Sequence, residues 1–348
     1  MSGRRPDRSK PAAAGLPLPR RLLITGGSAI ATLGGLAILA LLVAAWLYGG
    51  PGPARKPTTV ILRPGAGVSE IAASLERSGV VGSAAVFMAA AQVSGAAHHL
   101  KAGEYAFDAH ASLARVIGEI RSGRVVRHMI TIPEGLTSEE AVAVLMDSEV
   151  LTGAAPVPPE GAILPDTYEV RRGEDRGAVL QRMMDARDNL LRALWAQRRP
   201  DLPLRSPEEV MILASIVEKE TGLAAERPKV AAVFVNRLRR GIRLQSDPTI
   251  IYGLNRGKPL GRGIKESELA TYTPYNTYLI DGLPPTPICN PGRASIAAVL
   301  DPPQTDDLYF VADGSGGHVF ASTLEEHQKN VEHWRAVEHQ AKPAGSGG

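Results

Sequence analysis

The most constraining feature of the sequence is a long uncharged stretch near its start. No charged residue occurs between Leu22 and Gly50, and Leu, Ile, Ala and Val dominate the second half of the stretch. About 20 apolar residues are enough to cross ~30 Å of hydrocarbon as a helix. We therefore predict a transmembrane helix over residues 22–48. Trp46 and Tyr48 would then lie at headgroup level, which amphipathic rings favour.

The residues before this stretch predict its orientation. Residues 1–21 contain one acidic residue, Asp7, and six basic residues: Arg4, Arg5, Arg8, Lys10, Arg20 and Arg21. Positive charge is retained on the cytoplasmic side, so residues 1–21 are predicted to be a disordered cytoplasmic tail. The alternative is a cleaved signal peptide, whose apolar region usually spans only ~7–15 residues. We expect a single-pass protein of the inner (plasma) membrane whose later residues work outside the cytoplasm.

Composition excludes several other classes. The 348-residue chain has a net charge of only +3, which gives no argument for nucleic-acid binding. Its single cysteine, Cys289, cannot form an intramolecular disulfide. The eight histidines are scattered without zinc-ligand spacing, and neither a P-loop nor a dinucleotide fingerprint occurs. No metal and no cofactor is therefore predicted.

Hydrophobic periodicity predicts an α+β fold in two parts. Residues 49–57 are a Gly/Pro-rich linker, and residues 58–125 form a small subdomain. Its predicted elements, in β-α-α-β order with a connecting helix, are a strand at 58–62, helices at 69–76 and 84–93, a strand at 101–107 and a helix at 112–122.

The larger, mixed α/β domain is predicted over residues 126–341, followed by a flexible tail at 342–348. Thr137 and Glu140 form a capping-box pattern at the start of one helix. Residues 241–305, rich in Gly, Pro, Thr and Tyr, should contain few regular elements. The predicted elements are a strand at 125–132, helices at 137–147, 176–198, 207–222 and 225–240, a strand at 308–312 and a helix at 324–341.

The most informative element is the helix predicted in SPEEVMILASIVEKETG, residues 206–222. Ser206 is predicted to be its N-cap, with Pro207 in the first turn and Glu209 completing a capping box, and Gly222 can terminate it.

The helical spacing separates two glutamates of this segment. At ~100° per residue, Leu213, Val217 and Glu220 fall within roughly 60° of one another, which places Glu220 on an apolar stripe and Glu218 nearer the polar side. Apolar surroundings raise the pKa of a carboxyl group, and a protonated Glu can protonate the leaving oxygen of a glycosidic bond. The alternative is that Glu220, one turn from the helix end, reaches water or pairs with an Arg.

Several longer motifs resemble one enzyme family. They are EGAILPDTYEV (160–170), ASIVEKETG (214–222), ERPKVAAVFVNRLRRGIRLQSDPTIIYG (226–253), TPYNTYLIDGLPPTPICNPG (273–292) and LYFVADGSGGHVFASTLEEH (308–327). In this order they resemble the endolytic murein transglycosylases, or YceG-like family, over most of residues 126–330. The unit at 58–107 resembles the LysM-like subdomain of these proteins.

The resemblance implies a reaction. Such enzymes cut the β-1,4 bond between N-acetylmuramic acid and N-acetylglucosamine inside nascent glycan strands. The muramyl 6-hydroxyl attacks its own C1 and leaves a 1,6-anhydro end without addition of water. One glutamate acts first as acid and then as base, and the family motif assigns this role to Glu220. Thr221 resembles the Ser that follows the catalytic Glu in other lytic transglycosylases. Peptidoglycan strands, the membrane and peptidoglycan synthases are the partners implied.

Further substrate-binding residues are predicted in two irregular segments. Gln245, Ser246 and Asp247 precede a proline, where short polar side chains can reach sugar hydroxyls. Asp247 could instead cap the turn, or stabilise developing oxocarbenium charge. The second set is Tyr275, Asn276 and Tyr278, whose rings and amide suit sugar stacking and acetamide binding but could equally be structural.

Three other polar residues, Arg237, His318 and Asp166, are expected to be mainly structural. Arg237 and Asn236 lie on the predicted helix 225–240, and Arg237 is expected to brace the fold. His318 follows two glycines, and Asp166 follows a proline and should serve a turn.

Two other functions remain open. A muramidase would cleave the same bond by adding water. A membrane-tethered, non-catalytic peptidoglycan-binding scaffold would need only the LysM-like unit, but Glu220 on an apolar stripe argues against it.

Overall fold

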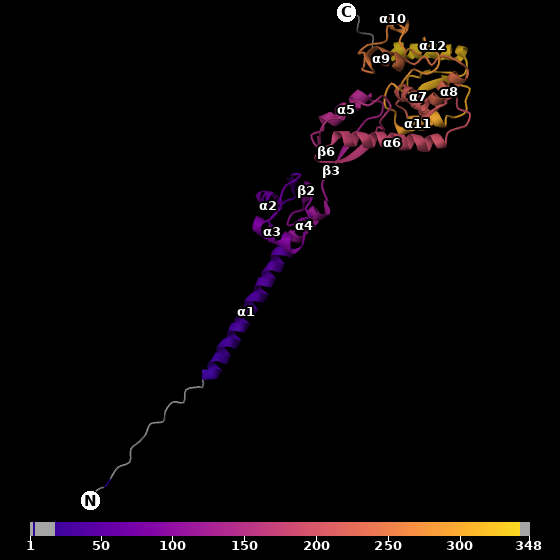
Figure 1. Ribbon diagram of the computed structural model, residues 1–348. Helices are drawn as coiled ribbons and strands as arrows, with labels where there is room; N and C mark the ends of the chain where they lie inside the picture. Colours follow the sequence, from indigo (N-terminus) through magenta and orange to yellow (C-terminus); the bar gives the residue numbers. More distant parts are fainter. Residues whose placement is uncertain (1–2, 4–17, 342–348) are drawn as a thin grey trace, which may run out of the picture. The chain divides into compact units, whose positions relative to one another are not determined.

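The computed structural model describes residue 3 and residues 18–341 (Figure 1). Most of the predicted tail 1–21 and all of the tail 342–348 lie outside the described residues. The chain divides into two compact units, Met1–Val126 and Arg127–Gly348. Each unit is an α+β assembly, and the described strands pair only in twos.

Unit 1 contains the N-terminal helix and a small β-α-α-β fold. Its elements are α1 (Leu18–Gly49), β1 (Thr58–Leu62), α2 (Val68–Arg77), α3 (Ala84–Val93), β2 (Gly103–Phe107) and α4 (Leu113–Ser122). Strands β1 and β2 are antiparallel, with Val60 opposite Tyr105. The inward faces of these elements enclose Phe87, Tyr105 and Phe107, which confirms the predicted order of elements.

Helix α1 holds the predicted apolar stretch. Within it, Ala31–Gly49 is 19 residues long with a mean hydropathy of 2.0, and its described side chains are exposed. By length and composition this segment is able to cross a membrane.

The linker between α1 and β1 is folded onto unit 1. The Gly52 amide donates to the carbonyl of His110 (3.1 Å), and the His110 amide donates to the carbonyl of Ala54 (2.7 Å). The His110 ring contacts the Gly52 carbonyl at 3.2 Å. Composition alone predicted only a Gly/Pro-rich linker, because it does not reveal these distant partners.

Unit 2 is mostly helical. Its elements are β3 (Arg127–Thr131), α5 (Ser138–Asp147), β4 (Leu151–Thr152), β5 (Thr167–Arg171), β6 (Glu174–Asp175), α6 (Arg176–Ala196), α7 (Pro207–Glu220), α8 (Arg227–Arg239), α9 (Asp247–Asn255), α10 (Glu266–Leu269), α11 (Arg293–Leu300), β7 (Tyr309–Ala312), β8 (His318–Ala321) and α12 (Leu324–Ala341). Strand β5, absent from the predicted elements, pairs antiparallel with β3. The Thr137–Glu140 capping box is confirmed.

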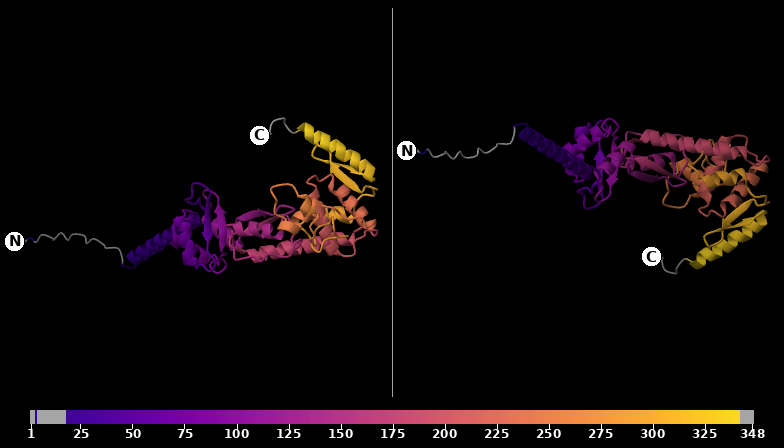
Figure 2. Two further views of the ribbon diagram at one scale, coloured as in Figure 1. Left: turned by 90° about the horizontal axis from the view of Figure 1, so that it is seen from above. Right: turned by 90° about the horizontal axis from the view of Figure 1, so that it is seen from below.

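Helix α7 lies in the centre of unit 2, where α6, α8, α9 and α11 pack around it (Figure 1). Eight consecutive residues, Val210–Val217, are buried. The expected apolar stripe is therefore wrong as a description of α7, because the middle of the helix has no polar side. Hairpin β7–β8 and α12, yellow in Figure 2, lie together at one edge of the unit.

The prediction that residues 241–305 hold few regular elements is wrong, since α9, α10 and α11 lie there. Helix α9 starts at Asp247-Pro248, which the sequence suggests is a tight turn. Helix α11 is short, and Ser295, Ile296 and Ala298–Leu300 are buried, so it lacks an amphipathic period.

Candidate active site

Helix α7 delivers Glu220 at its very end. The Ser206 hydroxyl accepts from the Glu209 amide (3.3 Å), and Pro207 occupies the first turn, as the sequence predicts. Glu209 accepts from the Arg205 amide, so the expected capping box is incomplete. Helical geometry stops at Glu220, because Thr221 is extended (φ −140°, ψ 132°). Glu220 thus projects from the last turn of a buried, fixed helix.

The two glutamates of the EKE run, Glu218 and Glu220, differ in their interaction partners and not in their burial, because both are largely removed from water. The Glu218 side chain is only 4% exposed, which contradicts its predicted place toward the polar side. It lies 3.1 Å from the Arg227 guanidinium and accepts from the Gly292 amide at 2.8 Å. Glu218 is therefore a buried, neutralised carboxylate that ties α7 to α8 and to the start of α11.

Glu220 has no such cationic partner among the described residues. Its Oε1 accepts a short hydrogen bond from the Ser246 hydroxyl. Burial raises the pKa of Glu220 to about 7, although the Ser246 hydrogen bond and the charges of His318 and Arg237 oppose the rise. The charge of Asp247 adds to it. A carboxyl group with this pKa can both donate and accept a proton near neutral pH.

Ser246 is held by a buried threonine network. Its amide donates to the Thr277 hydroxyl (2.9 Å), and its carbonyl accepts from the Thr249 hydroxyl (2.6 Å). The two threonine hydroxyls are 2.9 Å apart, and all three residues are buried. This network fixes the Ser246 hydroxyl, and therefore one oxygen of Glu220.

Asp247 and Tyr278 form a second pair beside Glu220. The Tyr278 hydroxyl donates to Asp247 Oδ1 at 2.7 Å. Burial, and next this hydrogen bond, raise the pKa of Tyr278, so the phenol remains a donor. The Asp247 residue is exposed, which leaves its carboxylate accessible from solvent.

These groups line one hollow of about 370 Å³. Its walls are Glu220, Arg237, Leu244, Gln245, Asp247, Tyr278, Phe310 and His327. Of the predicted site residues it brings together Glu220, Gln245, Asp247 and Tyr278, with Ser246 directly behind Glu220. Phe310 and His327 were not predicted, although both lie in a motif that carries the family resemblance.

Arg237 both braces the fold and lines the hollow. Its guanidinium donates to the carbonyls of Leu308 (2.7 Å) and Leu244 (2.8 Å) and to Gln245 Oε1 (3.2 Å). The predicted bracing role is confirmed by these bonds. Gln245 itself has a left-handed backbone (φ 52°), which turns the chain toward Ser246.

Tyr275 and Asn276 lie outside the walls of the hollow. Asn276 is buried, and its side chain donates to the carbonyls of Leu269 and Thr271 and accepts from the Tyr278 amide. These bonds satisfy its amide, so the structure makes it a loop-shaping residue, in contrast to the predicted sugar contact. The Tyr275 ring packs edge-on against Tyr252, with 4.8 Å between centroids.

His318 is connected to the end of α7 through Glu226. Its Nδ1 lies 2.7 Å from Glu226 Oε2, and its amide donates to Glu226 Oε1 (2.7 Å). The Thr221 hydroxyl donates to the same Glu226 Oε2 at 3.3 Å. Asp166 accepts from the amide of Thr167 (2.7 Å), in keeping with its predicted turn role. Among the side chains that the structure describes, no group of three or more His, Cys, Asp or Glu could hold a metal ion.

Comparison with known proteins identifies the family of this chain. The sequence pattern of the YceG-like family matches residues 60–333. The chain belongs to the YceG-like family. The family pattern thus spans all the residues that line the hollow.

Relatives extend this assignment. A Bacillus subtilis protein named endolytic murein transglycosylase is 28% identical over 301 residues, which are 77% of this chain and 82% of the relative. A Streptococcus pneumoniae protein of the same name is 29% identical over 327 residues, covering 80% of this chain and 58% of that longer relative. The crystal structure of a YceG-like protein from Listeria monocytogenes has a TM-score of 0.50 and 27% identity, covering 79% of this chain and 99% of the other.

Proposed function

We propose that this chain is an endolytic peptidoglycan lytic transglycosylase. It cleaves the bond between N-acetylmuramic acid and N-acetylglucosamine within nascent glycan strands and leaves 1,6-anhydromuramyl ends. The family assignment and the names of the relatives support the reaction class. The observation that carries the proposal is Glu220, whose carboxyl group lies in the hollow with a pKa of about 7 and without an ion-pair partner among the described residues.

The proposed mechanism needs only this carboxyl group to move protons. Protonated Glu220 donates to the glycosidic oxygen as the bond from C1 breaks, and positive charge develops on the sugar ring. The muramyl 6-hydroxyl then attacks C1, and the Glu220 carboxylate takes the hydroxyl proton. The carboxyl group ends as it began, and no water is consumed. Ser246 occupies Oε1, which leaves Oε2 for the substrate.

The remaining walls of the hollow are assigned supporting roles. Asp247 is a carboxylate beside Glu220, suited to stabilising the oxocarbenium charge. Tyr278 orients it through the 2.7 Å hydrogen bond. Gln245, fixed by Arg237, offers its amide nitrogen to sugar oxygens.

A muramidase remains the second candidate, because Asp247 supplies a second carboxylate in the same hollow. Hydrolysis by paired carboxylates uses such an arrangement. The products separate the two reactions, since a 1,6-anhydro end is lighter by one water than a reducing end.

The test is product analysis by mass spectrometry with the full chain in detergent and purified glycan strands. We expect 1,6-anhydromuramyl ends from the wild type, none from Glu220→Gln and wild-type yields from Glu149→Gln. Glu149 is an exposed residue and serves as the matched control. Reducing muramyl ends would establish the muramidase, and an active Glu220→Gln protein would overturn the assignment of Glu220.

We extend the proposal to the whole chain. Residues 22–48 anchor it with the N-terminus in the cytoplasm, residues 58–125 are a LysM-like subdomain, and residues 126–341 are the catalytic domain. The anchor keeps the enzyme near new strands, where it terminates elongation beside the peptidoglycan synthases. A version exported without the anchor that terminated strands at unchanged lengths in cells would refute this role.

A further inference from the structure

Two adjoining hollows lie between the outer end of α1 and the small subdomain of unit 1. One has a volume of about 430 Å³ and reaches from Trp46 to Val80 and Val81. The other, of about 490 Å³, reaches from Ala44 to Val93. Leu47, Val86 and Leu113 line both hollows. We call the combined feature the α1–α3 groove, defined by Ala44, Leu47, Tyr48, Val86, Val93 and Leu113.

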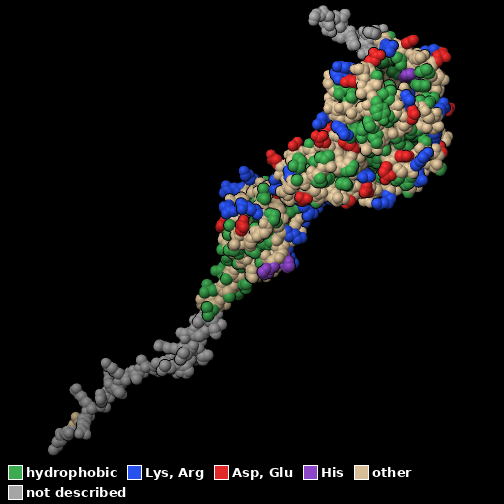
Figure 3. Space-filling model, turned by 45° about the horizontal axis from the view of Figure 1, so that its top comes forward, with side chains coloured by type: hydrophobic (Ala, Val, Ile, Leu, Met, Phe, Trp, Pro, Cys, Tyr) green, Lys and Arg blue, Asp and Glu red, His purple; other side chains and the backbone are tan. Residues whose placement is uncertain are grey.

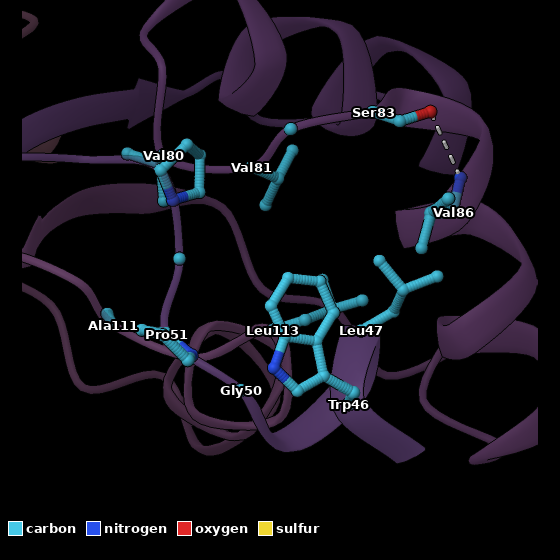
Figure 4. A pocket seen from close by; sticks show the side chains of 13 residues that line it. Trp46, Leu47, Gly50, Pro51, Val80, Val81, Ser83, Val86, Ala111 and Leu113 are labelled. Carbon is cyan, nitrogen blue, oxygen red and sulfur yellow. Dashed lines mark hydrogen bonds between the residues drawn. The ribbon is translucent and has the colours of Figure 1, made fainter. Parts of the chain in front are cut away.

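The lining of the groove suits hydrocarbon. No charged residue lines either hollow. Figure 4 shows Leu47 and Val86 facing one another, with the Trp46 ring beside them. The hydroxyls of Ser83 and Ser94 are occupied, because Ser83 accepts from the Val86 amide and Ser94 donates to the Ala91 carbonyl. An occupant would gain apolar contact and few hydrogen bonds.

Helix α3 extends this apolar surface. Residues 78–97 contain no Asp, Glu, Lys, Arg or His. Phe87 and Ala91 face the core, whereas Val93 at the rim of the groove is 92% exposed. Hydrophobic side chains are also visible on the lobe that adjoins α1 in Figure 3. Exposure of this apolar surface to water is unfavourable, and the cost grows with the exposed area.

The position of the groove along α1 identifies what covers it. Ala44 and Leu47 belong to the apolar segment Ala31–Gly49. Ala44 lies five residues before the end of that segment, or about 7.5 Å along a helix. Interfacial helices bury their apolar faces ~5–10 Å into the boundary between headgroups and acyl chains. If α1 crosses the membrane, one wall of the groove is therefore already in this layer.

We propose that the α1–α3 groove holds an acyl chain of a membrane phospholipid, so that α3 rests in the interfacial layer of the bilayer. The proposal rests on the membrane anchoring proposed above. It gives unit 1 a second membrane contact besides its spanning helix. With the linker hydrogen-bonded to His110, the β-α-α-β fold is then held against the lipid surface.

The test places an environment-sensitive nitrobenzoxadiazole dye at single introduced cysteines in the full chain. The chain is reconstituted in phosphatidylcholine vesicles, in one set with acyl chains brominated close to the headgroup and in another with acyl chains brominated near their middle. Bromine quenches only dyes that reach its depth.

The three sites are Val93→Cys in the groove, Leu41→Cys in α1 and Ile61→Cys on β1. Ile61 is the matched control, since it is 54% exposed in the same unit and lines neither hollow. Cys289 is buried, and the unsubstituted chain serves as the labelling blank.

We expect loss of most dye emission at positions 41 and 93 and no loss at position 61. Quenching at 41 with none at 93 overturns the groove proposal and leaves the anchor intact. Absence of quenching at 41 shows that the anchoring itself fails. Equal quenching at 93 and 61 overturns a specific groove. Disulfide-linked dimers of unlabelled Val93→Cys at low protein density would mean that a second copy covers the groove, which also overturns the proposal.

Discussion

Replacing Glu220 by a neutral residue should stabilise the folded protein, but only at a pH at which Glu220 would otherwise be ionised. The pKa of this carboxyl group rises from an ordinary 4.5 to about 7 on folding, mainly through burial. One pKa unit corresponds to ~1.4 kcal/mol, so ionisation of Glu220 lowers the free energy of unfolding by about 3 kcal/mol. Glu220→Gln keeps the size of the side chain and an oxygen that can accept from Ser246, but removes this cost.

The pH dependence follows from the direction of the shift. Below about pH 4.5 both the folded and unfolded states hold the proton, so wild type and Glu220→Gln should be equally stable. Between pH 4.5 and 7 the unfolded wild type ionises first and the difference grows. Above pH 7 the difference in stability stays constant, and it corresponds to a Tm about 6–12 °C higher for Glu220→Gln in a unit of this size.

The assay is thermal unfolding of the full chain in one detergent from pH 4.5 to 9, followed by tryptophan fluorescence. Trp195 and Trp334 report on unit 2, and Glu149→Gln controls for loss of a surface charge. A Glu220→Gln protein with the wild-type Tm at pH 8.5 would refute the reasoning, because Glu220 would then be ionised without cost. Lower stability than wild type would show that the carboxylate has a favourable partner.

Three further outcomes are expected. Ser246→Ala removes the hydrogen bond that lowers the pKa of Glu220, so the alkaline limb of kcat/KM should move to higher pH, and a move to lower pH would contradict this. Tyr278→Phe leaves Asp247 without its phenolic donor and should lower kcat roughly 10-fold with little change in Tm, which steady-state kinetics and melting together can check. Gly52→Ala places a Cβ 2.2 Å from the Ala111 carbonyl oxygen and should free the linker, seen as faster proteolysis within residues 50–57. Gly67→Ala, which meets nothing within 4 Å, is its control, and equal cleavage of the two variants would argue that the linker is not held.

Local signals in the sequence located much of the scaffold. The uncharged stretch predicted α1, and the change from alternating to helical periodicity predicted the β-α-α-β order of unit 1. The start of α7 followed from Ser206 and Pro207, whose capping chemistry depends on adjacent residues alone. Such features are visible in sequence because their physical causes act within one or two turns of chain.

The reason why Glu220 differs from Glu218 was not local. Helical spacing suggested an apolar and a polar side, but the other helices of unit 2 enclose the middle of α7 completely. Glu218 is also buried, but Arg227 from α8 forms an ion pair with it. Residues of other elements therefore decide which buried carboxyl group is ion-paired and which has a pKa of about 7.

The sequence by itself therefore determined an apolar segment long enough to cross a membrane, the order of most elements and, through its motifs, the family. Tertiary structure decided the surroundings of Glu220. The Ser246 hydroxyl, Arg237, Phe310 and His327 come from four separate segments and meet around one carboxyl group. The folded linker was likewise settled by its hydrogen bonds with His110, and the groove beside α1 by the residues of α1, α3 and α4 that line it. Burial depends on what packs against a residue and not on the residue alone.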